Sequence, residues 1–381
     1  MKILHLCLSN FYIDNYSYQE NELVRQNIMD GHEVLVIASL ESMTPDGNLI
    51  YLEPSTYDGA DGAKVIRIPY KKFLPRFIMK KLRIHDGLFK ILLKEKPDVV
   101  LFHSLCGWEL LTVMKYKKLN PDLKFYADSH EDFNNSARSF ISKWILHWLY
   151  YRPIIRLTKK KIDKILCISI ETMNFVKVMY GLKSNEIEFF PLGGFTYSDA
   201  TYADIRYSNR HKFAISDEDL VFVQSGKMNK SKKLINSLEA FCALKEDSAL
   251  FFIAGSIHES IAHDAFELIQ NDKRIKFVGW LNSEDLKGLL CAADVYIQPG
   301  TQSATMQMSL CCRCAVILDD VPSHKPYIYN NGWIINDNLQ LMEAISSAIK
   351  NPKFTKEMGL NSGVLANGIL DYKKLASRLY V

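Results

Sequence analysis

The sequence predicts an α/β protein with two successive domains, each built on a mostly parallel sheet with helices on both faces. Short apolar runs of strand length alternate with amphipathic stretches along almost the whole chain, which is the pattern of repeated βαβ units. The alternation stops in a polar segment at residues 196–217 and then restarts. A length of 381 residues exceeds one ordinary core and accommodates two.

The first half of the chain contains seven apolar runs that we expect to form strands, because each is short and bounded by polar residues. They are residues 2–8, 33–39, 64–70, 98–104, 124–129, 164–169 and 187–193. Helical patterns lie between them, such as the one that includes Leu23 and Val24. These elements predict an N-terminal domain over residues 1–195, on which a C-terminal helix at about 366–381 is expected to pack.

The second half repeats the pattern with six further runs. They are residues 220–226, 248–256, 275–280, 294–300, 315–320 and 332–337. The polar segment 196–217 shows no clear period, so we interpret it as a linker. The second domain is expected over residues 218–365.

Composition narrows the possible functions. A net charge of +4 is too small to indicate nucleic-acid binding by itself. The first ten residues do not resemble a signal peptide, since His5, Ser9 and Asn10 interrupt the apolar run, and no run reaches the roughly 20 apolar residues of a membrane span. We therefore expect a cytoplasmic protein with reduced cysteines. The triplet Cys311, Cys312 and Cys314 is too tightly spaced for usual zinc ligands, so no metal is expected.

Candidate site residues follow the strands, because ligands of open parallel sheets bind beyond the carboxyl ends of the strands. The segment "SGKMNKSKK" at 225–233 follows the first strand of the second domain and places four lysines after Gly226. A diphosphate requires positive charge and close backbone amides. The alternative is an ordinary solvated start of a helix.

A second candidate lies in "PGTQSATMQMSLCC" at 299–312. Ser303 is a good N-cap, and the amides of Ala304 and Thr305 would open the helix that follows. Their partial positive charge would attract a phosphate, although a capped helix without a ligand has the same pattern.

These segments resemble the family-four glycosyltransferases. Gly226, Lys227 and Lys232 fall on that family's glycine, basic residue and second lysine, and "MKILHL", "DGHEVLVIAS", "KPDVVLFHS" and "FFPLGG" resemble its N-terminal landmarks in order. The resemblance implies a GT-B fold, which is two Rossmann-like doubly wound domains with an interdomain cleft. It also implies sugar transfer from a nucleotide-sugar with retention of configuration, with Lys227 and Lys232 neutralising the donor diphosphate without a metal.

The sequence departs from the family at two glutamates spaced eight residues apart. Alignment places them at Gly300 and Met308, and methionine cannot accept hydrogen bonds from a ribose as a carboxylate does. Donor recognition would then depend on amides and hydroxyl or amide side chains. The candidates are Gly226, Gly255, Thr301, Gln302, Ser303, Ala304, Thr305 and Gln307.

In the first domain, His130 in "YADSHEDFNN" matches the family histidine that reaches the reacting centre. The alternative is that His130 is an ordinary loop residue that pairs with a charged neighbour. The family's Gly-Gly turn after the first strand is replaced by "SNFYIDNYSYQEN", which predicts a different acceptor. The acceptor-side candidates are Asp14, Asn15, Tyr16, His103 and Asp128.

Two segments combine basic and apolar residues. Residues 70–96 hold nine Lys or Arg against two acidic residues. In residues 138–164 a helical stripe contains Phe140, Ile141, Trp144, Ile145, Trp148 and Leu149. Such faces bind anionic membranes, or they pack on the sheet with a solvated basic back.

We therefore expect a retaining, metal-independent glycosyltransferase of the hexosyltransferase type. It would move a sugar from a nucleotide-sugar to a glycan or lipid-linked acceptor in bacterial cell-surface polysaccharide synthesis. It would use no cofactor beyond this substrate, bind no nucleic acid and lie in the cytoplasm or at the inner face of the membrane. The alternatives are a non-catalytic relative that binds sugar or scaffolds a complex, and a sugar-nucleotide epimerase or phosphorylase on the same architecture.

Overall fold

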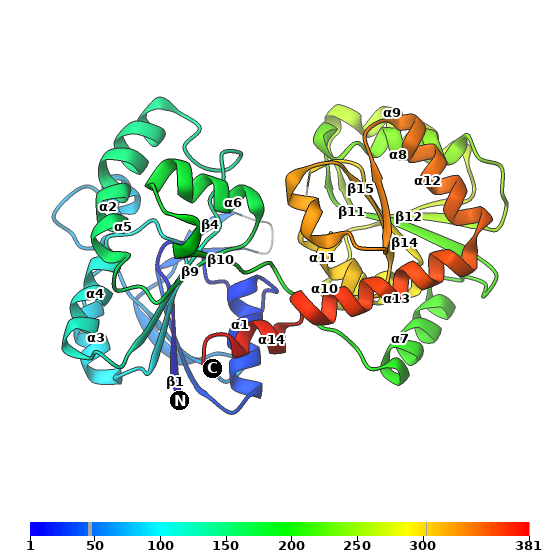
Figure 1. Cartoon of the computed structure of the whole chain (residues 1–381). Helices are drawn as coiled ribbons and strands as arrows, with labels where there is room; N and C mark the ends of the chain where they lie inside the picture. The colour runs from blue at the N-terminus through cyan, green and yellow to red at the C-terminus, as the bar shows by residue number, and fades with distance from the viewer. Residues whose placement is uncertain (45–47, 302, 381) are drawn as a thin grey trace. The chain divides into compact units, whose positions relative to one another are not determined.

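The computed structural model describes residues 1–44, 48–301 and 303–380 (Figure 1). The chain divides into two compact units. The N-terminal domain comprises Met1–Pro191 together with the C-terminal stretch from Leu375, and the C-terminal domain comprises Leu192–Lys374. Each contains its own parallel sheet, as the alternating sequence pattern predicts.

The N-terminal sheet has the strand order β10-β9-β8-β7-β1-β2-β6-β5. All neighbouring strands in it are parallel except β5, which pairs with β6 in the antiparallel sense. The strands are β1 (Lys2–Cys7), β2 (Glu33–Ala38), β5 (Ser55–Asp58), β6 (Lys64–Arg67), β7 (Val99–Phe102), β8 (Lys124–Ser129), β9 (Lys164–Cys167) and β10 (Ile187–Phe189). A separate hairpin joins β3 (Glu41–Met43) and β4 (Leu49–Tyr51).

Helices cover both faces of this sheet because its strand residues alternate between two apolar clusters. On β2, Leu35 and Ile37 belong to one cluster and Val34 and Val36 to the other. The helical elements are α1 (Gln19–Met29), α2 (Arg76–Leu82), α3 (Leu88–Glu95), α4 (Glu109–Leu119), the π-helix η1 (Ile141–Tyr151) with α5 (Arg152–Thr158), α6 (Ile170–Phe175), the π-helix η2 (Val176–Tyr180) and the 3₁₀ turn η3 (Ser184–Glu186).

The C-terminal sheet is parallel throughout, with the order β13-β12-β11-β14-β15-β16. Its strands are β11 (Leu220–Met228), β12 (Ala249–Ile257), β13 (Ile275–Gly279), β14 (Val295–Gln298), β15 (Ala315–Asp319) and β16 (Gly332–Ile335). The helical elements are α8 (Leu234–Cys242), α9 (Glu259–Asn271), α10 (Ser283–Ala292), α11 (Ala304–Cys311), α12 (Asn338–Lys350) and α13 (Pro352–Ile369), with the 3₁₀ turns η4 (Lys230–Lys232) and η5 (Pro322–Tyr327).

The segment that we interpreted as a linker is largely helical and belongs to the C-terminal domain. It contains α7 (Asp199–Lys212), which begins at the N-cap Ser198. Polar contacts fix this helix: Arg206 donates hydrogen bonds to the carbonyls at 291–293 and pairs with Asp294 at 2.6 Å. Because arginines rather than an apolar stripe attach α7, its sequence lacks the period that predicts a helix.

The C-terminus also differs in detail from the single helix expected at about 366–381. α13 ends at Ile369, α14 (Tyr372–Ser377) follows, and the chain rejoins the N-terminal domain from Leu375. There Arg378 pairs with Glu188 and the Tyr380 hydroxyl donates to Asp30. Within the described residues, no helix combines the length and the apolar character needed to span a bilayer.

Candidate functional site

Glycines let three loops meet at the carboxyl edge of the C-terminal sheet. Gly226 and Gly255 lie opposite each other near the carboxyl ends of the adjacent strands β11 and β12, and their φ values of 125° and 131° favour glycine. A Cβ atom on Gly255 would lie 1.9 Å from the Gly226 carbonyl oxygen, and one on Gly300 would lie 2.1 Å from that of Ser231. A Cβ on Gly226 would meet no atom within 4 Å. Gly226 therefore borders open space where a ligand can approach the backbone.

The lysines that follow Gly226 have different environments. Lys232 donates a hydrogen bond from Nζ to the Thr301 carbonyl oxygen at 2.8 Å, and burial lowers its pKa to about 8. Lys233 pairs with Asp319 at 2.8 Å, whereas Lys227 and Lys230 are exposed. Lys232 is thus fixed beside the loop that precedes α11, and Lys227 is accessible from solvent.

Ser303 is the N-cap of α11, as the sequence predicts. Its Oγ accepts from the Met306 amide at 3.3 Å and donates to Gln298 Oε1 at 2.9 Å. The Gln298 amide in turn donates to the Thr301 carbonyl at 2.5 Å. These bonds hold the N-terminus of α11 beside Lys232, which joins a helix dipole to a fixed cation.

The remaining donor-site candidates differ in their exposure to solvent. Ala304 is exposed and Thr305 half-buried in the first turn of α11. Gln307 is fully buried and donates to the Tyr327 hydroxyl at 2.6 Å, so its amide packs inside the domain. The predicted donor residue Gln302 lies outside the described residues.

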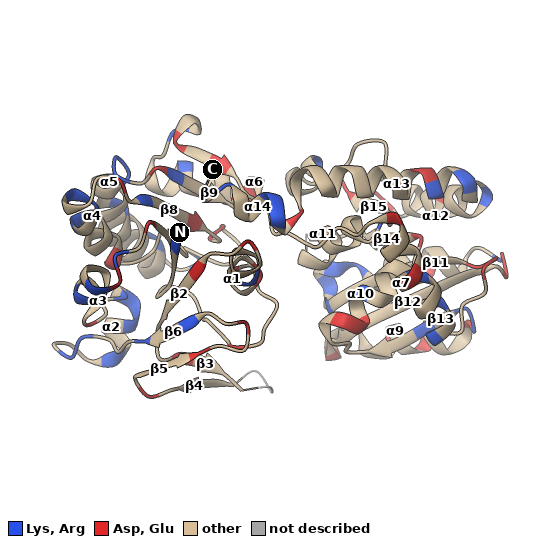
Figure 2. Cartoon of the chain, turned by 90° about the horizontal axis from the view of Figure 1, so that it is seen from below, with Lys and Arg blue, Asp and Glu red and all other residues tan. Residues whose placement is uncertain are grey.

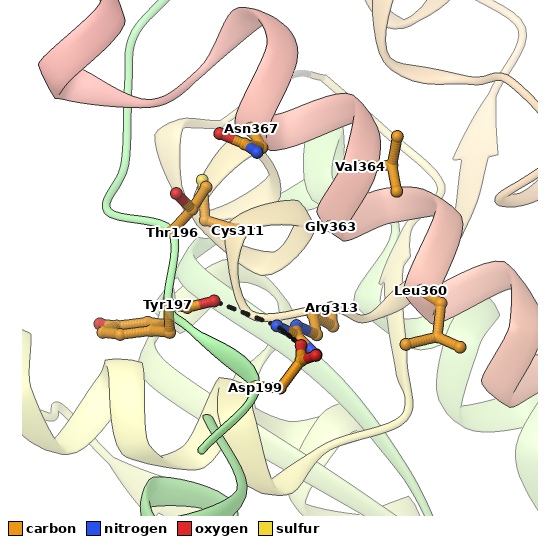
Figure 3. A pocket seen from close by; sticks show the side chains of 9 residues that line it. All are labelled: Thr196, Tyr197, Asp199, Cys311, Arg313, Leu360, Gly363, Val364 and Asn367. Carbon is orange, nitrogen blue, oxygen red and sulfur yellow. Dashed lines mark hydrogen bonds and ion pairs between the residues drawn. The ribbon is translucent and has the colours of Figure 1, made fainter. Parts of the chain in front are cut away.

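A hollow of about 220 Å³ lies at the other end of α11 (Figure 3). Arg313 crosses it, donating to the Tyr197 carbonyl at 3.0 Å and pairing with Asp199 at 2.7 Å. Because Arg313 precedes β15, this hollow borders the amino end of the sheet, opposite the edge where ligands of parallel sheets bind.

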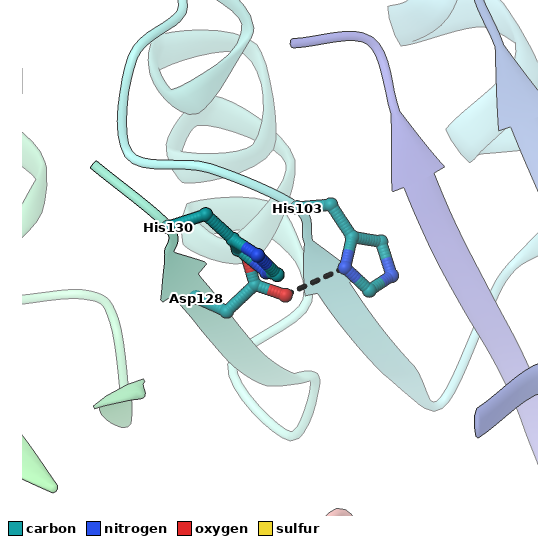
Figure 4. Close-up of side chains that lie close together, drawn as sticks. All are labelled: His103, Asp128 and His130. Atoms are coloured by element: carbon teal, nitrogen blue, oxygen red, sulfur yellow. Dashed lines mark hydrogen bonds and ion pairs between the residues drawn. The ribbon is translucent and has the colours of Figure 1, made fainter. Parts of the chain in front are cut away.

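In the N-terminal domain, His103 and Asp128 come together because β7 and β8 are adjacent and parallel. His103 Nδ1 donates to Asp128 Oδ2 at 2.6 Å (Figure 4). The Ser104 amide donates to Asp128 Oδ1 at 2.7 Å. His130 Nε2 lies 3.4 Å from Oδ1, close enough for an ion pair but not aligned as a hydrogen bond. His103 and Asp128 are buried, whereas the His130 side chain is 33% exposed.

The negative charge of Asp128 and the positive charges of the histidines stabilise one another. Burial alone would raise the pKa of Asp128, but the charges of His103 and His130 hold it well below its usual range. Burial alone would lower the pKa of His130, but Asp128, together with Glu20 and Glu131, raises it to about 9. His130 is therefore an imidazolium at neutral pH, suited to donate a hydrogen bond rather than to remove a proton.

Glu131 also belongs to this cluster, but it is not among the site residues predicted from the sequence. Its carboxylate accepts from the hydroxyls of Ser104 and Ser129 and from the His130 amide, the last at 3.2 Å. Burial raises the pKa of Glu131, but these hydroxyl bonds and the charge of Arg83 lower it overall. The signal available in the sequence was its position after a strand, next to His130.

A cavity of about 260 Å³ lies beside this cluster. Its lining includes Asn10, Arg83, Glu131 and His147. Arg83 donates to the Cys106 carbonyl at 2.6 Å. The mixture of carboxylate, guanidinium and amide groups suits a ligand rich in hydroxyl groups.

The predicted acceptor loop has mainly structural contacts. Asp14 pairs with the buried Arg67 at 2.9 Å and accepts from the Tyr57 hydroxyl at 2.9 Å. Asn15 is exposed with φ 64°, and Tyr16 is half-buried. Asp14 therefore anchors the loop to β6, and Asn15 and Tyr16 are the members with free surface.

One group of possible metal ligands occurs among the described residues. Atoms of His103, Asp128 and His130 lie within 4.8 Å of one another. Both Asp128 oxygens and both His103 ring nitrogens already take part in hydrogen bonds, so we assign no metal to them.

The two domains match two family models. "Glycosyltransferase Family 4" matches residues 21–193, and "Glycosyl transferases group 1" matches residues 206–362. No curated protein matches the sequence with significance.

Solved structures resemble the whole chain in fold. Sucrose-phosphate synthase from Thermosynechococcus elongatus has a TM-score of 0.66 and 14% identity, covering 99% of this chain and 97% of that one. Anabaena HepE in complex with UDP has a TM-score of 0.67 and 13% identity, covering 99% and 98%. WaaG, a glycosyltransferase involved in lipopolysaccharide biosynthesis, has a TM-score of 0.64 and 17% identity, covering 99% of each. The predicted GT-B fold is confirmed.

The raised pKa of His130 gives a prediction about pH. The pKa of His130 should be about 9 in the folded protein, against an ordinary value of about 6.5. The ion pair with Asp128 should stabilise the fold fully below pH about 6.5 and lose this effect as the pH rises through about 9. The measurement is an NMR titration of the His130 ring, with Asp128→Asn expected to lower its pKa. Titration of wild-type His130 near the ordinary value would contradict the electrostatic assignment.

Proposed function

The chain belongs to the glycosyltransferases, since its two halves match two of their family models, and we propose that it transfers a sugar from a nucleotide-sugar donor with retention of anomeric configuration. The observation that supports this most is the group of Gly226, Lys232 and the capped start of α11 at one edge of the C-terminal sheet. The HepE structures that the fold resembles were solved with UDP and UDP-glucose, which makes a uridine donor the first to test.

The diphosphate of the donor would lie against Lys227, Lys232 and the first amides of α11. Negative charge develops on the nucleoside diphosphate as the glycosidic bond breaks, and fixed cations and amides stabilise that charge. In this proposal the lysines supply the charge compensation without a metal ion. The ribose would be bound by Thr301 and Ser303, since residues 300 and 308 provide no carboxylate.

The reaction step needs no protein base. The bond from the sugar C1 to the phosphate oxygen breaks, a bond from C1 to the acceptor oxygen forms on the same face, and the acceptor proton passes to the leaving phosphate. His130 is already protonated at neutral pH, so it would donate a hydrogen bond to the reacting sugar. Asn10, Glu131 and other polar residues of the nearby cavity would bind the acceptor hydroxyls.

One observation favours a second candidate. The two family glutamates are replaced by Gly300 and Met308, and a relative that had lost catalysis could still bind sugar or scaffold a complex. Release of sugar from a nucleotide-sugar distinguishes the two, because the non-catalytic protein would bind nucleotide without any turnover.

We also propose that the acceptor belongs to the bacterial cell-surface polysaccharide pathway and is presented at a membrane. The six apolar residues of the predicted stripe lie on η1 and its N-cap residue, and they are exposed, with fractions from 45% to 74%. They are Phe140, Ile141, Trp144, Ile145, Trp148 and Leu149. The opposite face of η1 buries His147 and Tyr151, so the stripe itself is not needed for the core.

The basic segment that begins at residue 70 continues this surface. Phe73 and Phe77 are 61% and 71% exposed, beside Lys71, Lys72 and Arg76. The two segments adjoin, because the Tyr150 hydroxyl donates to the Leu82 carbonyl at 3.0 Å. Lys and Arg residues line α2 and α5 in Figure 2. An apolar surface with a basic border fits an anionic bilayer.

Donor binding gives the test of the nucleotide site. Lys232→Ala should weaken binding of uridine diphosphate by about 1.5–3 kcal/mol, or roughly 10- to 150-fold in Kd, because a charge-assisted contact is lost. Calorimetry measures the affinity, and sugar release from UDP-glucose measures turnover. Lys230→Ala is the matched control, since it removes an exposed charge from the same turn. Equal affinity of wild type and Lys232→Ala would exclude this placement of the diphosphate.

Vesicle flotation tests the membrane surface. The double variant Trp144→Ser/Trp148→Ser should remain folded by circular dichroism, because both side chains are 45% exposed, and should lose most binding to vesicles rich in anionic lipid. Wild-type binding should decrease with salt as charges are screened. Leu119→Ser, at a 63% exposed residue of α4, is the control. Undiminished flotation of the double variant would rule out this surface.

A further inference from the structure

A continuous series of side-chain contacts crosses the interior of the N-terminal domain and ends at His130. Asn27 Oδ1 of α1 lies 2.9 Å from His5 Nε2 on β1. His5 Nδ1 lies 3.0 Å from His103 Nε2, and the two imidazole rings stack with an interplanar angle of 15°. His103 Nδ1 then bonds Asp128, which pairs with His130. Asn27 and His5 are fully buried.

With Asn27 Oδ1 facing His5, counting protons along this series gives the charge of each ring. An amide oxygen can only accept, so His5 must carry its proton on Nε2. Burial and the neighbouring His103 charge lower the pKa of His5 to about 3, so His5 is neutral and its Nδ1 can only accept. His103 must therefore donate from Nε2. The ionised Asp128 also accepts, so His103 donates from Nδ1 as well. A ring that donates from both nitrogens is an imidazolium.

We propose that Asn27 and His5 are positioning residues that hold His103 as a buried imidazolium, which shares the Asp128 carboxylate with His130. His103 fixes one oxygen of that carboxylate, and the Ser104 amide fixes the other beside His130. The Asp128 side chain cannot then rotate to pair with His130 alone. The relevance of this arrangement to catalysis rests on the proposed function, in which the charge of His130 faces the reacting sugar.

The surroundings can accommodate this buried charge. Asp128 lies between the two cations, and further charges compensate them at longer range. The titratable and charged groups around the two histidines are His5 and Cys7 of β1, Glu20 of α1, Asp128 of β8, Glu131 after β8, and Arg83 at the end of α2. Glu20 and Glu131 are both buried, so their charges act on the histidines through a medium of low polarity.

The opposite orientation of the Asn27 amide is the competing arrangement. Asn27 Nδ2 is buried and makes no well-aligned hydrogen bond within the described residues, although the Asn27 amide interacts with the Tyr380 hydroxyl, whose pKa is raised by burial and lowered in part by this interaction. If this nitrogen faced His5, the Asn27–His5 and His5–His103 hydrogen bonds would reverse. His103 would still donate to Asp128 from Nδ1, but its Nε2 would accept and the ring would be neutral. The two arrangements therefore differ by one proton on His103 Nε2, which is measurable.

The imidazolium also has a consequence for metal binding. A ring nitrogen that carries a proton has no lone pair to offer a metal ion. His103, Asp128 and His130 have atoms within 4.8 Å of one another, and the proposal assigns two protonated rings rather than a cation to that cluster. Zinc added to the protein should therefore leave the His103 ring unchanged.

The experiment is ¹⁵N NMR of the full-length protein labelled at its ten histidines, with His103 and His5 assigned by single substitutions. We expect both His103 ring nitrogens to carry protons, and one His5 nitrogen to be unprotonated. Addition of zinc ions should shift neither. A wild-type His103 with an unprotonated nitrogen, or one shifted by zinc, would overturn the proposal.

Two variants test the role of the series. Asn27→Leu removes the acceptor and frees His5 to donate from Nδ1, so His103 should lose one proton and the pKa of His130 should rise as a neighbouring charge disappears. His5→Gln keeps a carbonyl acceptor for His103 and should preserve its two protons. An unchanged His130 titration in Asn27→Leu would refute the coupling, and if that variant does not fold, the wild-type spectrum still decides. No substrate is present, so failure of the proposed sugar transfer would leave this result unaffected.

Discussion

The constraint on which the rest of the structure depends is the parallel direction of the strands. In a parallel sheet every loop that follows a strand lies at the same edge, so residues far apart in the sequence become neighbours. This places Gly226, Gly255 and Gly300 together in one domain, and His103 next to Asp128 in the other. Gly255 and Gly300 are required because a Cβ on them would lie 1.9 and 2.1 Å, respectively, from a backbone oxygen. This close packing of Gly300 against the 231–232 backbone brings Lys232 beside the N-terminus of α11.

The replacement of the two family glutamates changes which groups of the proposed donor site could bind a ribose. Gly300 cannot offer a side chain, and its place is packed against Ser231. Polar groups in the preceding loop are already engaged, since the Thr301 carbonyl accepts from both Lys232 and Gln298. The loop is thus organised by its own hydrogen bonds, and a ribose would meet hydroxyl groups and main-chain atoms. In the proposed function, this loop would therefore contribute more to binding the diphosphate than to selection among sugars and bases.

The sequence predicted the features that depend on local pattern. The strand runs, the domain repeat and the Ser303 cap were accessible from periodicity and capping chemistry, and the resemblance supplied His130 and the lysines. Features that depend on tertiary partners were not predictable. α7 lacks an apolar period because Arg206 attaches it through carbonyls, and Gln307 faces the interior because Tyr327 accepts its amide. The roles of His5 and Asn27 depend on register across β1, β7 and α1, which no local pattern reports.

The central claim is that the C-terminal domain binds the nucleotide and that a charged His130 in the N-terminal domain assists the transfer. The most direct measurement compares wild type and His130→Gln for two quantities, the affinity for uridine diphosphate and the rate of sugar release from UDP-glucose. The account predicts an unchanged affinity and a rate reduced by roughly 10²–10³-fold, the usual loss for one preorganised donor. A full rate in His130→Gln, or a loss of nucleotide affinity, would contradict it.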